Sequence, residues 1–149
     1  MADAVTNSPA SNSAIVSVRD FHVRFATPDG EVHAVKDVSF DINEGECLGI
    51  VGESGSGKSQ LFLAGVGLLA ANGRTEGSFL YRGQNLTGMS QKQLNQIRGA
   101  KITMIFQDPL TYLNPTRTIG SQIAETFRPR PTRAERRARV AEALLDVGL

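Results

Sequence analysis

The chain has 149 residues, and its 16 Lys and Arg nearly balance its 15 Asp and Glu, leaving a formal net charge of +1. This length suits one domain with a sizeable hydrophobic core. The balanced charge gives no reason to expect bulk attraction to nucleic acid or anionic lipid, and we predict no nucleic-acid partner. The single cysteine, Cys47, excludes an internal disulfide and suits a reducing compartment. We expect it to be buried as a small hydrophobic residue.

The N-terminal residues 1–14 are mostly Ala, Ser, Asn and Thr. They lack the basic start and the apolar core of a signal peptide, so we expect a disordered tail before a domain that occupies residues 15–149. No apolar run reaches the roughly 20 residues that span a bilayer, so any membrane association should be peripheral and mediated by other proteins.

Two half-buried antiparallel strands are predicted after the tail. Phe21, Val23 and Phe25 alternate with polar residues, and the apolar residues within 38–42 alternate in the same way. The sequences at 27–30 and 43–45 combine Gly with Pro, Asp or Asn, as turns do. An antiparallel layer is therefore expected before the rest of the domain.

The next strands are predicted from apolar runs. Residues 47–51 and 102–106 are almost entirely apolar, as expected of strands buried on both faces of a parallel sheet. Pro109 follows the second run and prevents it from continuing. A shorter strand is expected at 78–82, after a loop at 71–77.

Four helices are expected between and after these strands, at 58–70, at 90–98, at 118–127 and from 132 onward. Two of them begin with a capping-box pattern, formed by Ser90 with Gln93 and by Thr132 with Glu135. The last helix is amphipathic, and the residues expected to share its apolar face are Val140, Leu144 and Val147.

The central motif of the chain is Gly52-Glu53-Ser54-Gly55-Ser56-Gly57-Lys58-Ser59, which fits G-x-x-x-x-G-K-[ST] at every fixed position. Its glycines permit backbone angles closed to other residues, so successive N–H groups can turn inward around phosphate oxygens. Lys58 is expected to contact the β- and γ-phosphates, and Ser59 to complete a Mg²⁺ shell. The motif predicts binding of a nucleoside triphosphate; the alternative is a Gly/Ser-rich turn before a helix.

The class of nucleotide is narrowed by what the sequence lacks. A regulatory GTPase needs the strings N-K-x-D and D-x-x-G, and neither occurs in this chain. Kinase-like and helicase-like ATPases stay open at this point.

A cluster of basic residues lies near the C-terminal end, where six arginines fall between positions 128 and 139. They lack interleaved aromatic residues and are offset by Glu135 and Glu142. We therefore interpret them as a solvated helix face, with nucleic-acid binding as the alternative.

From about Val16 to its last residue, the chain resembles the ATP-binding subunit of an ABC transporter. Besides the motif at 52–59, the resemblance rests on Val35-Lys36-Asp37-Val38-Ser39-Phe40, on Asn43-Glu44-Gly45-Glu46 and on Met104-Ile105-Phe106-Gln107-Asp108-Pro109. The motif with Gln60, and Leu113-Asn114-Pro115, are similar to the oligopeptide, dipeptide and nickel importer group, especially its oligopeptide D-type subunit. Tyr112 stands where that group commonly has a serine.

The resemblance implies an α/β fold with a P-loop NTPase core of the ABC ATPase type, an N-terminal antiparallel β layer and the start of a helical subdomain at 110–149. It implies ATP and Mg²⁺ as ligands. The residues it assigns to ATP are Phe25, which would stack on adenine, and Gly52, Glu53, Ser54, Gly55, Ser56, Gly57, Lys58, Ser59 and Gln60. For Phe25 the alternative is an ordinary core residue of a strand.

Gln107 would be the Q-loop glutamine of the family, acting in catalysis by contacting Mg²⁺ or the attacking water. The metal would then be held by Ser59 and Gln107. The alternative for Gln107 is a polar residue at a strand end. Asp108 also fits a Walker B aspartate, but Gln107 before it and Pro109 after it favour the Q-loop.

Several family elements are missing from the sequence, namely the L-S-G-G-Q signature, the Walker B aspartate, the catalytic glutamate and the switch histidine. Without them a bound phosphate is positioned but water is not activated. We therefore expect the chain to be a truncated, N-terminal part of an ABC ATP-binding domain that binds ATP and is inactive alone.

The resemblance also implies a setting. The full subunit would use ATP to drive import of peptides or related small solutes such as nickel, at the cytoplasmic face of the inner membrane. Its partners would be a second ATPase subunit, identical or different, two transmembrane permease subunits and, indirectly, a solute-binding protein. The alternatives are a non-catalytic nucleotide-binding or interaction fragment and a part of a non-transport ABC ATPase.

Overall fold

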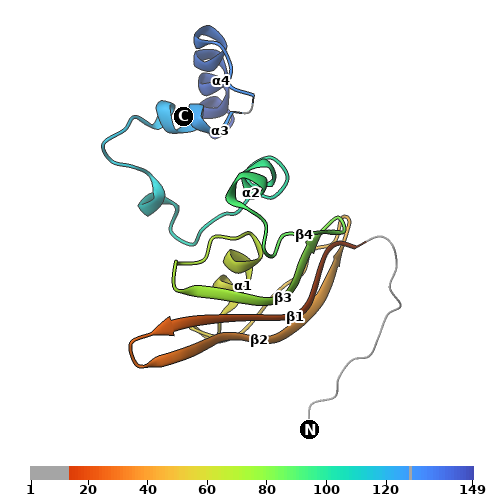
Figure 1. Cartoon of the computed structure of the whole chain (residues 1–149). Helices are drawn as coiled ribbons and strands as arrows, with labels where there is room; N and C mark the ends of the chain where they lie inside the picture. The colour runs from red at the N-terminus through yellow and green to blue at the C-terminus, as the bar shows by residue number, and fades with distance from the viewer. Residues whose placement is uncertain (1–13, 128) are drawn as a thin grey trace. The chain divides into compact units, whose positions relative to one another are not determined.

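The computed structural model describes residues 14–127 and 129–149, which form two compact units that divide after Leu94. The first unit contains a four-stranded sheet and helix α1, and the second contains α3 and α4 (Figure 1). The short helix α2 (Gln91–Ile97) spans the division. The tail expected at 1–14 falls outside the described residues except for Ala14.

The sheet of the first unit is built on one long hairpin. Strand β1 (Ala14–Thr27) pairs antiparallel with β2 (Gly30–Asn43), and Thr27 faces Gly30 across a two-residue turn. Gly30 has φ +122°, which suits a residue without a Cβ. Strands β3 (Gly73–Tyr81) and β4 (Gln84–Asn85) complete an antiparallel sheet in the order β2-β1-β3-β4. The predicted antiparallel layer is confirmed.

A bulge in β1 decides which residues enter the core. Val18, Phe21 and Val23 are all fully buried, although strict alternation would put Val18 on the opposite face. The pairing with β2 shifts register between Val18 and Phe21, where Asp20 takes φ +45°. The extra residue turns Val18 to the same side as Phe21.

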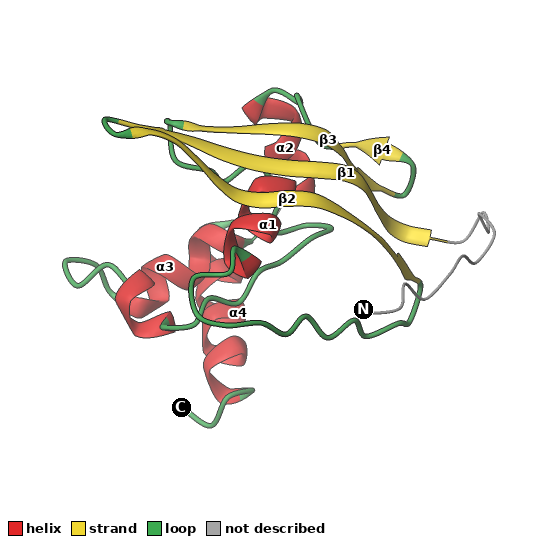
Figure 2. Cartoon of the chain, turned by 90° about the horizontal axis from the view of Figure 1, so that it is seen from below, coloured by secondary structure: helices red, strands yellow, loops and turns green. Residues whose placement is uncertain are grey.

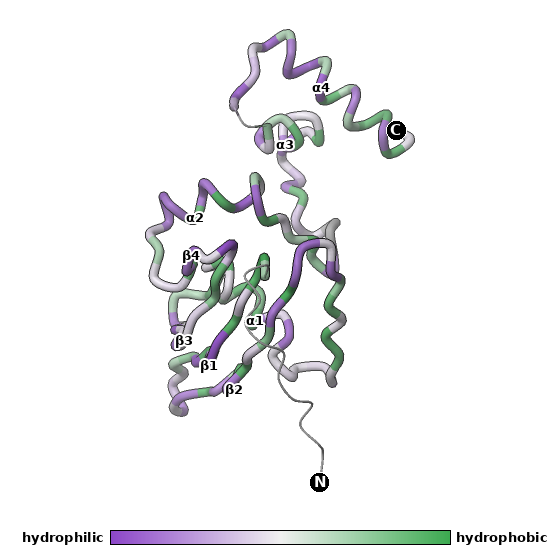
Figure 3. The backbone as a smooth tube through the Cα atoms, turned by 90° about the vertical axis from the view of Figure 1, so that its right-hand side faces the viewer, coloured by the Kyte–Doolittle hydropathy of each residue, from purple (hydrophilic) through white to green (hydrophobic). Residues whose placement is uncertain are grey.

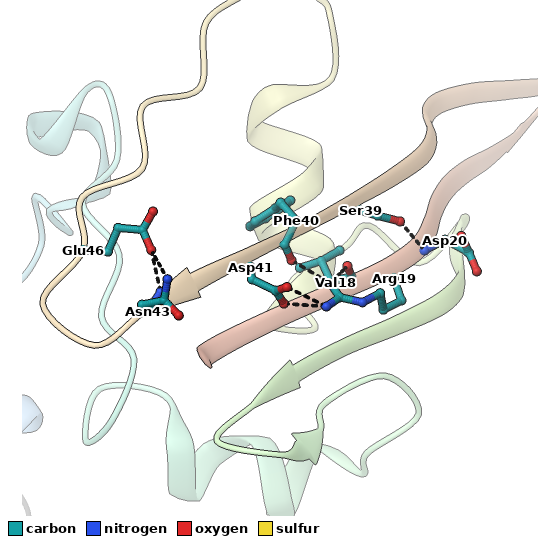
Figure 4. A network of polar contacts seen from close by, with 8 residues as sticks. All are labelled: Val18, Arg19, Asp20, Ser39, Phe40, Asp41, Asn43 and Glu46. Carbon is teal, nitrogen blue, oxygen red and sulfur yellow. Dashed lines mark hydrogen bonds and ion pairs between the residues drawn. The ribbon is translucent and has the colours of Figure 1, made fainter. Parts of the chain in front are cut away.

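Polar contacts hold this irregular part of the hairpin together (Figure 4). The guanidinium of Arg19 donates to both carboxylate oxygens of Asp41, at 2.8 and 2.6 Å. The backbone N–H of Asp20 donates to Ser39 Oγ at 2.9 Å. The hydrogen bond from Arg19 lowers the pKa of Asp41 from its ordinary value.

Helix α1 (Lys58–Gly65) lies against one face of the sheet (Figure 2). Leu61 and Ala64 of the helix are buried, and Gly65 rests on the ring of Phe79 in β3. A Cβ at Gly65 would come within 2.3 Å of that ring. Phe79 in turn meets Phe21 edge to face at 5.8 Å. The core of the first unit therefore lies between α1 and the sheet.

The helix predicted at 58–70 is shorter than expected because a Schellman motif ends it. Gly67 has φ +68°, its N–H donates to Ala64 O, and the N–H of Leu68 donates to Leu63 O at 2.7 Å. The strand predicted at 78–82 begins earlier than expected, at Gly73, because β1 pairs with residues 73–76 as well.

The two buried strands predicted at 47–51 and 102–106 are wrong. Neither run forms a strand, and the only pairing involving them in the described residues is an isolated bridge between Arg98 and Ile102. Val51 and Ile105 are each 94% exposed, and Cys47 is exposed rather than buried. Apolar composition signals a need for burial, but a strand forms only where a neighbouring strand supplies hydrogen-bond partners, and here none does.

Helices α2, α3 (Ile119–Thr126) and α4 (Arg133–Leu145) agree with the predicted segments. Both expected capping boxes form, since Ser90 exchanges hydrogen bonds with Gln93 and Thr132 exchanges them with Glu135. The polar first turns and apolar end of α4 are visible in Figure 3. Val147, expected on the apolar helix face, lies beyond the helix end and is 70% exposed.

Candidate functional site

The phosphate loop (residues 52–59) joins the extended segment after β2 to helix α1. Residues 52–56 are exposed, whereas Gly57 and Lys58 are half-buried. The loop is closed by two backbone hydrogen bonds, from Ser56 N to Glu53 O at 3.2 Å and from Leu61 N to Gly57 O at 2.9 Å. It therefore forms a compact turn that leads directly into the first turn of the helix.

The glycines of the loop are required for different reasons. Gly55 and Gly57 have φ +80° and +91°, which strongly favour glycine. A Cβ at Gly57 would lie 2.1 Å from the carbonyl oxygen of Ala34 in β2, and one at Gly52 would lie 2.8 Å from Ser56 Oγ. A Cβ at Gly55 would meet nothing within 4 Å. Gly57 thus places the loop directly on the backbone of β2.

The side chain of Lys58 lies over the loop that precedes it. Its Nζ donates to the carbonyl oxygens of Gly52 and Glu53, both at 2.7 Å, and to Ser56 Oγ at 3.2 Å. The ammonium group is therefore held at the centre of the loop by oxygen atoms. Phosphate oxygens are acceptors of the same kind, so they can replace these partners.

The start of α1 leaves its backbone donors available. Its N-cap is Gly57, no side chain caps the helix, and its first turn holds no acidic residue. Such a helix end carries free N–H groups and a partial positive charge. Ser59 is exposed in this first turn, with the half-buried Gln60 beside it. Together with Lys58, the arrangement can hold an anion with several oxygens.

Phe25 lies half-buried on β1, between Val32 of β2 and Gly73 of β3. A Cβ at Gly73 would come within 2.9 Å of Phe25 Cε1, so the ring covers the glycine. The Phe25 ring therefore packs against β3 at Gly73. Stacking of the ring on adenine stays a prediction.

Gln107 belongs to the second unit, where it is exposed just before the 3-10 helix η1 (Pro109–Tyr112). Phe106 and Tyr112 lie on either side of Gln107 in the sequence. Their rings stack, with the centroids 4.3 Å apart. The N–H and Oγ1 of Thr111 both donate to the Asp108 carbonyl, at 3.2 and 2.8 Å. These contacts hold the chain after Gln107 in a turn.

The structure brings predicted residues 52–60 together in the first unit and describes Gln107 with the second. Sequence reasoning missed the supports of the site. The Ala34 carbonyl beneath Gly57 carries no sequence signal, because every residue type supplies a backbone carbonyl. The departure from serine at Tyr112 was visible in the sequence, but the stacking of its ring on Phe106 was not predicted.

In residues 14–127 and 129–149 no group of three or more His, Cys, Asp and Glu side chains is placed to hold a metal ion. None of the helices in the described part of the chain has the length and apolarity to cross a bilayer.

Comparisons with known proteins cover most of the chain. The family model described as ABC transporter matches residues 35–149. The oligopeptide transport ATP-binding protein OppD of Salmonella typhimurium is 47% identical over 127 residues, which are 85% of this chain and 38% of that protein. The dipeptide transport ATP-binding protein DppD of Lactococcus lactis is 42% identical over 139 residues, which are 91% of this chain and 40% of that protein.

A structural comparison agrees with the sequence matches. A dimeric ATP-binding cassette, solved in a post-hydrolysis state with ADP and Pi, matches with a TM-score of 0.70 and 27% identity. The match covers 87% of this chain and 55% of that one. The chain thus spans about two fifths of the two curated relatives and about half of the solved cassette.

Proposed function

The chain belongs to the ABC transporter family, and on that premise we propose that it supplies the ATP-binding loop of an ATPase subunit that drives import of oligopeptides or dipeptides. The observation that carries the proposal is the phosphate loop, seated on β2 through Gly57 and joined to a helix end without a side-chain cap. The choice of solute rests on the relatives, which are transport ATP-binding proteins for these peptides.

The loop residues have distinct roles in this proposal. The β- and γ-phosphates of ATP would replace the carbonyl and hydroxyl partners of Lys58 Nζ. The first N–H groups of α1 would donate to the same phosphates. Ser59 would ligate Mg²⁺, which neutralises phosphate charge when it is bound. Phe25 would face the adenine base, and Gln107 would act as the Q-loop glutamine that contacts Mg²⁺ or the attacking water.

Hydrolysis requires more than these groups. A water molecule must be oriented and polarised at the γ-phosphate, and neither the N–H groups of the loop nor Lys58 accepts a proton from water. We therefore propose that these 149 residues bind ATP without turning it over. A second ATPase subunit would supply further contacts, and two permease subunits would hold the pair at the cytoplasmic face of the inner membrane.

The test is ATP binding by the unmodified chain and by Lys58→Ala, measured by isothermal titration calorimetry with and without Mg²⁺. Hydrogen bonds to charged groups are worth about 1.5–3 kcal/mol, so we expect an affinity loss of about tenfold or more. Lys92→Ala, which removes an exposed lysine of α2, is the matched control and should bind normally. Equal affinities of the Lys58 variant and the unmodified chain would rule out this role of the loop.

A further inference from the structure

The second unit contains a groove of about 740 Å³ between α3 and α4. We call it the arginine groove, because five guanidinium groups line it and only one carboxylate among the described residues does, that of Glu125. The five are Arg117, Arg130, Arg133, Arg136 and Arg137.

The geometry of the groove is fixed by close contact between its two helices. A Cβ at Gly120 of α3 would lie 3.3 Å from Cγ1 of Val140 in α4, so the helices nearly touch there. Both residues line the groove. The two helices therefore pack closely at this point, and the arginines of α4 line the groove beside α3.

The positive charges of the groove arginines are not balanced by acidic residues that line the groove. Arg117 and Glu125 form an ion pair at 2.5 Å, so the one carboxylate is already engaged. The other four arginines face the same space, which concentrates positive charge in one place although the net charge of the chain is only +1. Like charges gathered in this way repel each other, and an anion between them removes the repulsion.

Arg136 provides an independent sign of a missing partner. Its Nε is buried and has no hydrogen-bond acceptor within the described part of the chain. Buried N–H groups are nearly always paired, because leaving one without an acceptor costs the full loss of its hydration. Since Arg136 lines the groove, an anion bound there could accept from this nitrogen.

We propose that the arginine groove binds a phosphate-bearing anion. A phosphate group presents three terminal oxygens and close to two negative charges, and can accept from several guanidinium forks at once. A carboxylate has two oxygens and one charge, and Glu125 already fills that role for Arg117. The site lies wholly in the second unit and is separate in sequence from the phosphate loop, so it goes beyond the proposed function.

Two sources share this chemistry, a soluble phosphoanion and the phosphomonoester headgroup of an anionic lipid such as phosphatidic acid. Clusters of Arg and Lys on an amphipathic helix are typical of lipid recognition. Three of the five arginines lie on α4, and Arg130 lies three residues before it. The experiment therefore needs one arm for each source.

The first arm titrates pyrophosphate into the full 149-residue chain carrying Lys58→Ala, which silences the phosphate loop. The readouts are calorimetry and the NMR signals of the arginine Nε–H groups. We expect saturable binding that shifts the Arg136 signal, and at least a tenfold loss of affinity in Arg136→Gln. Arg136→Lys keeps the charge but loses the planar fork, so it should bind with intermediate affinity.

Arg139→Gln is the matched control, because it removes the same charge from α4. Arg139 stacks on Phe127 at 4.3 Å and does not line the groove. It should bind pyrophosphate like the unmodified groove, whereas Glu125→Gln should bind more tightly because a competing carboxylate is gone. Equal losses in Arg136→Gln and Arg139→Gln would reduce the effect to net charge and overturn the proposal.

The second arm measures co-sedimentation with vesicles of phosphatidic acid in phosphatidylcholine, against pure phosphatidylcholine. Binding to the anionic vesicles alone, lost in Arg136→Gln, would identify the lipid as the source, and binding of pyrophosphate would identify a soluble anion. Polyglutamate that bound as tightly as pyrophosphate would overturn the preference for phosphate. Failure to bind either phosphate probe would overturn the site itself.

Discussion

At the scale of single residues, Gly57 sets the position of the phosphate loop, because its Cα rests on the carbonyl of Ala34. Gly57→Ala adds a Cβ 2.1 Å from that oxygen and also forces φ +91° on a residue that disfavours it. We expect the free energy of unfolding to fall by more than about 2 kcal/mol, from backbone strain and overpacking together. Urea denaturation followed by circular dichroism measures this change.

Gly55→Ala separates the two causes. Its φ of +80° is equally unfavourable for alanine, but the added Cβ meets nothing within 4 Å. It should therefore lose only the strain contribution, about 1 kcal/mol. If the two variants were equally stable, the contact between Gly57 and β2 would have no energetic weight.

The ion pair of Arg19 and Asp41 gives a pH dependence. The hydrogen bond from Arg19 lowers the pKa of Asp41 in the folded chain. A carboxylate with a lowered folded pKa stabilises the fold above its unfolded pKa, near 3.9, and this contribution is lost as pH falls through the folded value. We expect Asp41→Asn to be less stable than the unmodified chain at pH 7, with the difference shrinking below about pH 4.

Urea midpoints of both proteins between pH 7 and pH 2.5 test this behaviour. Asp29→Asn, in the exposed turn of the same hairpin, serves as the control for removal of an acidic charge. A stability difference for Asp41→Asn that stayed constant over the whole pH range would contradict the prediction.

At the scale of elements, α4 depends on its first turn. Thr132 accepts from the N–H of Glu135 at 3.4 Å, and the carboxylate of Glu135 accepts from Thr132 N at 2.8 Å. Thr132→Ala should cost about 1 kcal/mol of helix stability, because it removes the cap. Hydrogen exchange at residues 133–137 should become faster in this variant, while Thr132→Ser, which retains the hydroxyl, should preserve protection. Unchanged exchange in Thr132→Ala would show that the cap is dispensable.

Local sequence patterns predicted the elements whose contacts lie between residues close together in the sequence. The alternation at Phe21 and Val23, the turn at 28–29 and both capping boxes all appear in the structure. The bulge at Asp20 could not be predicted, because it depends on how β2 pairs with β1. Apolarity at 47–51 and 102–106 predicted burial that the structure does not show, because the partners of such strands are set by distant segments that no local pattern supplies.

The turn at 52–57 and the start of α1 were predicted better than the strands around them. The motif at 52–59 specifies its own backbone angles through its glycines, so its turn and the start of α1 follow from the residues themselves. Phe25 and Gln107 were assigned through resemblance, and their roles depend on contacts with ligand. The sequence could not predict the contact between Gly57 and β2, because Ala34 makes this contact through its backbone oxygen.

At the scale of the whole molecule, the exposed apolar segments predict self-association. Val51 and Ile105 are each 94% exposed and lie in extended segments that form no strand, so their backbone groups and side chains are open to other chains. Sedimentation velocity should show an average mass that rises with concentration. The double substitution Val51→Glu and Ile105→Glu should suppress this rise.

Leu149→Glu is the control for added negative charge, because Leu149 is also exposed, at 76%, but lies outside both of these segments. It should leave the association largely unchanged. A chain that stayed monomeric at all concentrations would contradict the prediction that these segments cause self-association.

The contacts of Lys58 have a consequence for the entropy of binding. Immobilising a lysine side chain costs up to about 2 kcal/mol of rotamer freedom. Because three oxygens of the loop already order this ammonium group, that loss belongs to folding and does not recur when a ligand arrives. Phosphate binding at the loop would then be an exchange of one set of acceptors for another, with a small entropic penalty from the lysine itself.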